Sequence, residues 1–142
     1  MDRDLLRTQL RRHEGLRLHP YQDTVGKMTI GYGRNLDDVG ITRKEAGILL
    51  EEDIDRTLER LRKVDDFNQL DPVRQAVITN MAFNLGHAGV MSFTRMWAAI
   101  RHGDWEEAAH EMLNSRWHEQ VGERARELAE IMRLGEVEDA RA

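Results

Sequence analysis

Residues 14–34, with the sequence EGLRLHPYQDTVGKMTIGYGR, decide the fold, because a helical pattern ends where this stretch begins and an alternating pattern replaces it. Pro20 and the polar run 23–26 interrupt the stretch, as turn residues do. Apolar side chains alternate with polar or glycine residues on either side of that break, at Leu16, Leu18, Met28, Ile30 and Tyr32. Such alternation is typical of strands with one buried face, so the stretch predicts a small β-hairpin or meander.

The segment before this stretch has the pattern of a short amphipathic helix. Its apolar residues Leu5, Leu6 and Leu10 are spaced for one helix face. Gly15 is suited to the position that follows a helix, because glycine accepts a positive φ without strain. We therefore expect the helix to end one or two residues before Gly15.

From Thr42 onward the pattern is helical. Thr42 and Glu45 have the spacing of a capping box, and a helix of about 20 residues follows from them. Its apolar stripe consists of Ala46, Leu49, Leu50, Ile54, Leu58 and Leu61. Asp71 and Pro72 begin a central helix that ends at Gly86, and shorter helices are expected at 93–102, 104–114 and 116–134. The prediction is an α+β protein that is mostly helical.

The length of 142 residues is that of one ordinary domain, so we predict a single domain over residues 1–142. Residues 15–41 would form a β lobe, and the rest, including 1–14, a helical lobe with a ligand groove between the two. Asp and Glu outnumber Lys and Arg by 26 to 21, which argues against a nucleic-acid partner. The charge is uneven, because residues 1–35 carry a net +3 and the remainder −8.

Several kinds of site are excluded by the residue types present. The chain has no cysteine, and Gly31 and Gly33 lack the third glycine of a dinucleotide loop. His110 and His118 each precede a glutamate, but the second histidine of a zinc motif is missing at positions 114 and 122. We therefore predict no metal and no cofactor. With no apolar run of 18 residues and a charged N-terminus, we expect a soluble cytoplasmic protein without a signal peptide or membrane insertion.

Glu14 is the first candidate for chemistry. It lies where the first helix should end, so the partial negative charge of the helix end disfavours ionisation of its carboxyl group. A carboxyl that stays protonated is what a general acid requires, although a glutamate at a helix end can equally be a solvated surface residue.

The strand that follows holds a second clue. Thr29, Gly31 and Gly33 share one face, and two glycines in a strand indicate either a closely approaching ligand or a tight bend. Both interpretations stay open, and Asp23, in the preceding turn, can be an ordinary turn residue.

Asp53 lies on or beside the apolar stripe of its helix, where a carboxylate needs a partner. We expect that partner to be Arg34, while the alternative is that Asp53 lies at the edge of the stripe in water.

Three motifs in order carry a resemblance: EGLRL at 14–18, YQDT at 21–24 and TIGYG at 29–33. They resemble the phage-type lysozymes, or endolysins, of glycoside hydrolase family 24, the family of the T-even phage lysozyme. Shorter matches continue as far as SRW at 115–117, so the similarity covers nearly the whole chain. The resemblance implies a lysozyme-like fold, with a small β lobe beside a helical lobe and a cleft between.

The resemblance also implies an activity, that of a lysozyme or N-acetylmuramidase. Such an enzyme hydrolyses the β-1,4 bond between N-acetylmuramic acid and N-acetylglucosamine in peptidoglycan. Glu14 would protonate the leaving oxygen, Asp23 would stabilise the oxocarbenium-like transition state, and Thr29 would hold the attacking water, an arrangement that suits inversion. Supporting roles would fall to Arg124, which pairs with the catalytic glutamate in the family, and to Asn84. The expected substrate contacts are Phe83, Gly31 and Asn35.

Three departures from the family limit what the resemblance implies. Its best-known member has a histidine at the position of Arg34, so we expect a permanently charged, structural pair with Asp53 here. The segment between Arg34 and Thr42 is also shorter. Met96 and Glu111 replace small or amide residues that contact sugar, so those contacts are not transferred.

Hydrolysis has two alternatives. A lytic transglycosylase needs one acid and no hydrolytic water, and Asp23 and Thr29 argue against it. A non-catalytic glycan-binding module is opposed by the intact set of Glu14, Asp23 and Thr29. The family further implies a monomer that depends on a holin, stays in the host cytoplasm until lysis and serves a phage or prophage.

Overall fold

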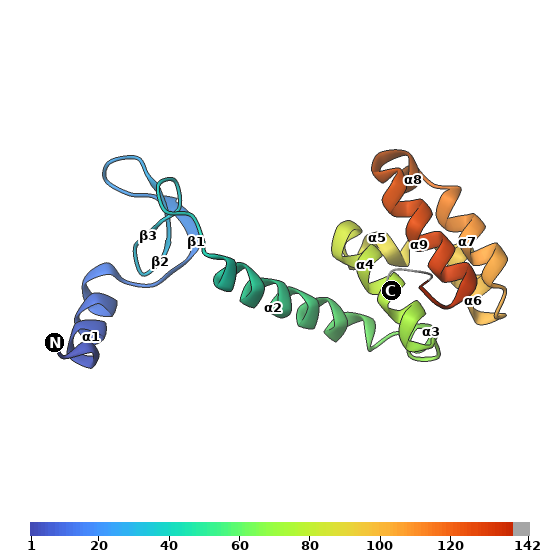
Figure 1. Ribbon diagram of the computed structural model, residues 1–142, viewed down its shortest axis with the longest axis horizontal. Helices are drawn as coiled ribbons and strands as arrows, with labels where there is room; N and C mark the ends of the chain where they lie inside the picture. Colours follow the sequence, from blue (N-terminus) through green and yellow to red (C-terminus); the bar gives the residue numbers. More distant parts are fainter. Residues whose placement is uncertain (138–142) are drawn as a thin grey trace. The chain divides into compact units, whose positions relative to one another are not determined.

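The computed structural model describes residues 1–137 of a chain that divides into two compact units, Met1–Leu49 and Leu50–Ala142. Within the first unit lie α1 (Arg3–Glu14), β1 (Arg17–Gln22), β2 (Met28–Gly31) and β3 (Arg34–Asn35), and the boundary falls inside α2 (Arg43–Leu61) (Figure 1). The second unit continues with α3 (Asp65–Asn68), α4 (Pro72–Leu85), α5 (His87–Met91), α6 (Thr94–Arg101), α7 (Trp105–Leu113), α8 (Arg116–Val121) and α9 (Glu123–Leu134). The expected α+β class is confirmed, whereas the single domain with its two lobes stays a prediction.

The first helix begins and ends as its sequence predicts. The Asp2 side chain accepts a hydrogen bond of 2.9 Å from the backbone N–H of Leu5, which satisfies one of the free donors of the first turn. At the other end Gly15 has a φ of 71°, and its N–H donates to the carbonyl of Arg11 at 3.1 Å. Glu14 is consequently the last helical residue.

The three strands form one antiparallel sheet in the order β1-β2-β3. Gly31 and Gly33, with φ of +71° and +83°, bend the chain between β2 and β3. This conformation is strained for residues with a side chain, so the tight-bend interpretation of the two glycines is supported. Thr29 is the most deeply buried residue of β2, at 4% exposure, whereas Met28, Ile30 and Gly31 are half-buried.

The predicted capping box at the start of α2 is present. The N–H of Glu45 donates to the Thr42 hydroxyl at 3.1 Å, and the Glu45 carboxylate accepts from the N–H of Thr42 at 2.9 Å. The apolar stripe of α2 is buried only toward its end. Leu61 is fully buried, whereas Leu49 and Leu50 are each 48% exposed.

The core of the second unit is built around α4, with α7 packed between α6 and α9. The most deeply buried side chains of α4 are Val77, Ile78 and Met81. Arg74 of α4 is also buried, and its guanidinium donates to the Met132 carbonyl at 2.7 Å, near the end of α9. This bond satisfies a carbonyl that the helix end leaves without a partner.

The helical prediction needs two corrections in this unit. The expected helix at 116–134 is two helices, α8 and α9, because Gly122 takes a φ of 55° and breaks the helical path. The short helices α3 and α5 were not predicted, since four or five residues are too few to show a helical period. Within residues 1–137, no helix is both long and apolar enough to cross a membrane.

Candidate active site

The carboxyl group of Glu14 lies against the backbone of Gly33. A β-carbon placed on Gly33 would come within 2.8 Å of Glu14 Oε2, closer than atoms of side chains normally approach. The last residue of α1 and the bend between β2 and β3 therefore meet within the first unit. Gly33 serves this site in two ways, since it supplies the positive φ and leaves room for the carboxylate.

Asp23 and Thr29 are joined through the main chain of Lys27. Asp23 Oδ1 accepts hydrogen bonds from the N–H groups of Val25 at 2.9 Å and Lys27 at 2.8 Å, which makes an Asx turn. The Lys27 carbonyl in turn accepts from the Asp23 N–H and from the Thr29 hydroxyl, each at 2.9 Å. One peptide segment thus determines where both predicted catalytic side chains lie.

The hydrogen bonds of Asp23 and Thr29 leave one oxygen of each side chain able to accept a further hydrogen bond. Asp23 Oδ2 accepts no hydrogen bond from residues 1–137. The Thr29 hydroxyl donates its hydrogen bond to the Lys27 carbonyl, so the lone pairs of its oxygen can accept a hydrogen bond from a water molecule. The pair therefore offers a carboxylate oxygen and a hydroxyl acceptor.

Arg34 and Asp53 each have a charge partner within their own unit. The Arg34 guanidinium donates to Glu45 at 2.7 Å and to the Gly40 carbonyl at 3.1 Å. The hydrogen bond from Arg34 and, next in size, the one from the Thr42 backbone N–H lower the pKa of Glu45 to about 2. Asp53 pairs with Arg56, one turn further along α2, at 3.2 Å. Each residue thus has a charge partner in its own unit. The expected Arg34–Asp53 pair would join the two units, and it stays a prediction.

Asn35 is committed to the loop that follows β3. Its amide donates to the Asp38 carboxylate at 2.9 Å, and its carbonyl oxygen accepts from the Asp38 N–H at the same distance. The Lys27 ammonium group donates to the other carboxylate oxygen of Asp38 at 3.2 Å. These contacts explain how the short segment after Arg34 is held, and the predicted substrate roles of Asn35 and Gly31 stay predictions.

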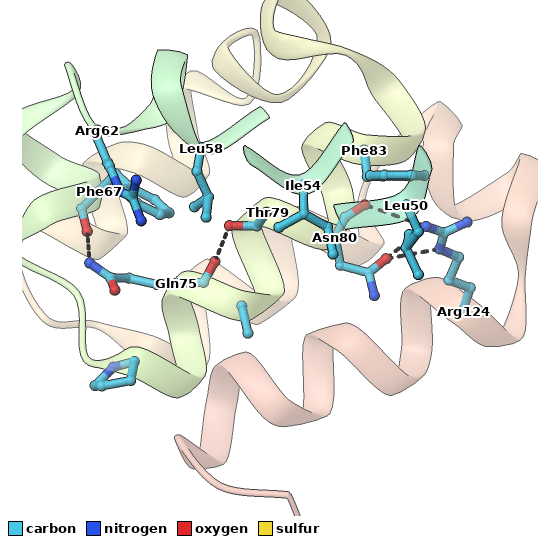
Figure 2. A pocket seen from close by; sticks show the side chains of 12 residues that line it. Leu50, Ile54, Leu58, Arg62, Phe67, Gln75, Thr79, Asn80, Phe83 and Arg124 are labelled. Carbon is cyan, nitrogen blue, oxygen red and sulfur yellow. Dashed lines mark hydrogen bonds between the residues drawn. The ribbon is translucent and has the colours of Figure 1, made fainter. Parts of the chain in front are cut away.

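The second unit has a groove of about 560 Å³ between α2, α4 and α9 (Figure 2). Leu50, Ile54 and Leu58 of α2 line it, and Phe83, which is 45% exposed, lies toward one end. Arg124 lies at the same end in Figure 2 and donates to the Asn80 side-chain oxygen at 2.7 and 3.1 Å. This end of the groove therefore offers an aromatic face, an amide and a guanidinium.

Asn84 has a structural partner. Its side-chain oxygen accepts a hydrogen bond of 2.8 Å from the indole N–H of Trp117, whose ring packs edge-on against Phe93. Asn84 is itself exposed, and its amide nitrogen has no partner among residues 1–137. Asn84 thus orients Trp117 and keeps a free donor.

Met96 and Glu111, the two departures from the family pattern, line a separate pocket of about 430 Å³. Met96 is fully buried in the core, which explains why a large apolar residue is tolerated there.

One group of side chains in α7 has ligand spacing. Glu107, His110 and Glu111 each bring one donor atom within 4.8 Å of the others. The zinc motif with two histidines does not include this set, whose positions i, i+3 and i+4 share a helix face. Three exposed or half-exposed ligands are one fewer than structural zinc sites use. The set could hold a cation weakly, and the absence of a metal stays a prediction.

Three residues of the candidate site were missed from the sequence. They are Gly33 as the neighbour of Glu14, Glu45 as the partner of Arg34, and Asn80 as the partner of Arg124. The sequence contains a weak indication that Asn80 belongs to the site, because Asn80 lies three residues before Phe83 on the same face of α4. The Asn80–Arg124 contact spans 44 residues and has no local signature.

Comparison with known proteins agrees with the motifs of the first unit. A family model for phage lysozyme matches residues 11–133. The chain is 33% identical to the pre-baseplate central spike protein Gp5 of Enterobacteria phage T4, over 91% of this chain, and spans only 28% of that protein's length. It is 28% identical to the probable T4-type lysozyme 1 of Dictyostelium discoideum, over 92% of this chain and 94% of that protein.

A further relative is an endolysin of Acyrthosiphon pisum secondary endosymbiont phage 1, which is 34% identical over 73% of this chain and 72% of that protein. The family match covers both units, from the last turns of α1 to the last turn of α9. The chain therefore belongs to the phage lysozyme family.

Proposed function

We propose that this chain is a peptidoglycan hydrolase that cleaves the β-1,4 bond between N-acetylmuramic acid and N-acetylglucosamine. Membership of the phage lysozyme family and the similarity to lysozymes and an endolysin support a hydrolase of this type. The observation that carries the proposal furthest is the connection of Asp23 and Thr29 through Lys27, in the same unit as Glu14.

Glu14 acts as the general acid. It gives its proton to the glycosidic oxygen as the bond to the anomeric carbon breaks, so that the departing sugar leaves as a neutral alcohol. The carboxyl group lies against Gly33. Because Gly33 has no side chain, none blocks a sugar ring from approaching the carboxyl group at that position.

Asp23 and Thr29 act on the opposite side of the reacting carbon. The free oxygen of Asp23 faces developing positive charge in the oxocarbenium-like transition state, and a negative charge there lowers the barrier. Thr29 accepts a hydrogen bond from the attacking water, which leaves a lone pair of that water free to form the new bond. A single attack by water inverts the configuration at the anomeric carbon.

The end of the groove at Phe83 is suited to carbohydrate. An exposed aromatic ring offers an apolar face to the C–H groups of a sugar, and the Asn80 and Asn84 amides nearby in sequence offer hydrogen bonds. We assign Phe83 to substrate binding on this basis.

In the biological setting that we propose, the enzyme lyses the host of a phage or prophage. It would collect in the host cytoplasm, act on the cell wall after a holin opens the membrane, and work as a monomer. The similarity to an endolysin supports this setting.

Product analysis tests the proposal. Purified peptidoglycan is digested with the wild type and with Glu14→Gln, and the new ends are identified by mass spectrometry. We expect reducing N-acetylmuramic acid ends from the wild type and a loss of at least 10²-fold in rate for Glu14→Gln, as is typical when a general acid is removed. Anhydromuramoyl ends would indicate a transglycosylase instead. Binding without release of fragments would indicate a non-catalytic module.

A further inference from the structure

Besides the groove at Phe83, the unit Leu50–Ala142 has a polar pocket between α2 and the start of α5. This pocket, of about 340 Å³, is called the arginine pocket here and is lined by Asp53, Arg56, Thr57, Arg60, Phe83 and His87, together with two small residues. Arg56 and Arg60 are four residues apart on α2, so both extend from the same helix face. His87 is the first residue of α5.

The arginine pocket has more positive charge than its carboxylate can balance. Asp53 pairs with Arg56 at 3.2 Å, while Arg60 makes no ion pair with any residue from 1 to 137. The pKa of His87 is lowered by burial and, next in size, by the positive charge of Arg60, which faces the same pocket. His87 Nδ1 also has no hydrogen-bond partner in the part of the chain described.

This excess of positive charge in the arginine pocket contrasts with the net negative charge of its unit. Residues 50–142 hold twelve Lys or Arg residues against nineteen Asp or Glu residues, so the surroundings are acidic. Two cations that face one pocket repel each other, and an anion between them would remove that repulsion. Thr57 adds a hydroxyl whose proton goes to the Asp53 carbonyl at 2.8 Å.

Phe83 connects this pocket to the proposed glycan site. The same ring lines both the groove that contains Asn80 and Arg124 and the arginine pocket. A sugar bound on Phe83 would therefore have the substituents on one of its edges close to Arg60. In peptidoglycan the substituent on the muramic sugar is a short peptide with free carboxylates.

We propose that the arginine pocket binds a carboxylate of the peptide stem of peptidoglycan, through Arg60 and Arg56. This inference rests on the proposed function for its choice of ligand. The volume accommodates one or two amino-acid residues, and a guanidinium can hold a carboxylate with two parallel hydrogen bonds. The pocket would thus make the enzyme prefer glycan that still has its peptides.

A direct binding experiment tests the site without relying on catalysis. The probe is the stem tripeptide L-alanyl-γ-D-glutamyl-meso-diaminopimelate, and the imidazole resonances of His87 report its binding by NMR. The same tripeptide with its carboxylates amidated is the control ligand. We expect shifts at His87 only with the free acid, and binding roughly tenfold weaker for Arg60→Gln, as for one lost charge-assisted hydrogen bond.

A kinetic experiment with two substrates completes the test. Arg60→Gln should raise KM roughly tenfold on peptidoglycan with its peptides and leave kcat unchanged. On glycan strands from which an amidase has removed the peptides, it should match the wild type. Arg126→Gln is the matched control, because Arg126 pairs with Glu123 on α9 and does not line the arginine pocket.

The outcomes separate the two proposals. If the wild type releases no reducing ends from either glycan, the proposed hydrolase is wrong, and the tripeptide titration still decides the pocket. Equal binding of the free and amidated tripeptides, no shift at His87, or the same KM change on both glycans would each overturn the assignment of the arginine pocket.

Discussion

Replacement of Gly33 by alanine tests whether the position of the Glu14 carboxyl group matters for catalysis. The new β-carbon would lie 2.8 Å from Glu14 Oε2, whereas ordinary contacts are 3.4 Å or longer. The carboxyl group is the far end of a flexible side chain, so it can move away at little energetic cost. It must, however, move by about half an ångström or more, and the general acid would then be displaced from the leaving oxygen.

The magnitude of each effect follows from the geometry. A residue other than glycine at a φ of +83° costs roughly 1–2 kcal/mol, which is about 3–7 °C in Tm for a chain of this length. A misplacement of one ångström at a reacting group costs on the order of 10²-fold in rate. For half that distance we expect kcat to fall roughly tenfold, with no comparable change in KM.

The assay pairs release of reducing ends from peptidoglycan with thermal unfolding followed by circular dichroism. Gly103→Ala is the matched control, since Gly103 has a φ of +66° with nothing within 4 Å of the added β-carbon. It should lose similar stability and keep full activity. If Gly33→Ala also keeps the wild-type kcat while its Tm falls, the argument that this carboxyl position supports acid catalysis is wrong.

Three further predictions concern charge. The pKa of Glu45 is held at about 2 by hydrogen bonds from Arg34 and from the Thr42 N–H. These contacts stabilise the fold above pH 4.5, and their contribution is lost as the pH falls toward 2. In acid unfolding followed by circular dichroism, Glu45→Gln should therefore lose less stability over that range than the wild type, and parallel curves would contradict this. Arg74→Ala should lower the free energy of unfolding, measured in urea, by roughly 1–3 kcal/mol, because the Met132 carbonyl loses its donor. A loss below about 1 kcal/mol would count against that role. Activity should fall as salt rises, since residues 1–35 carry a net +3 and the substrate is anionic, and a flat salt profile would refute this charge argument.

Local signals predicted the helices and turns well where one or two residues control the backbone. Asp2 and Gly15 bound α1, and Asp71 accepts from the Arg74 N–H at 3.0 Å to start α4. These features depend on contacts within four residues, so the pattern of residue types is enough to predict them. The break at Gly122 was missed, because a glycine inside a helical pattern is compatible with both a continuous and a broken helix.

The ion pairs show where such reasoning stops. Arg34 was expected to meet Asp53, because a carboxylate beside an apolar stripe needs a cation. Within the first unit, Arg34 pairs with Glu45, which is closer along the chain and already fixed by its bond to Thr42. The pair with Asp53 would join the two units and stays a prediction. A sequence contains several carboxylates that satisfy the same requirement, and only the folded backbone determines which of them lies within reach.

By itself the sequence determined the α+β class, the positions of most turns and caps, and the ordered set of Glu14, Asp23 and Thr29, because these follow from local backbone preferences and from motifs. The tertiary structure alone decided what surrounds those residues. It placed Glu14 against Gly33, buried Thr29 of β2, and brought Arg60 and His87 to one pocket. Those contacts join segments that are distant along the chain, and they exist only because packing of the helices and the sheet brings the segments together.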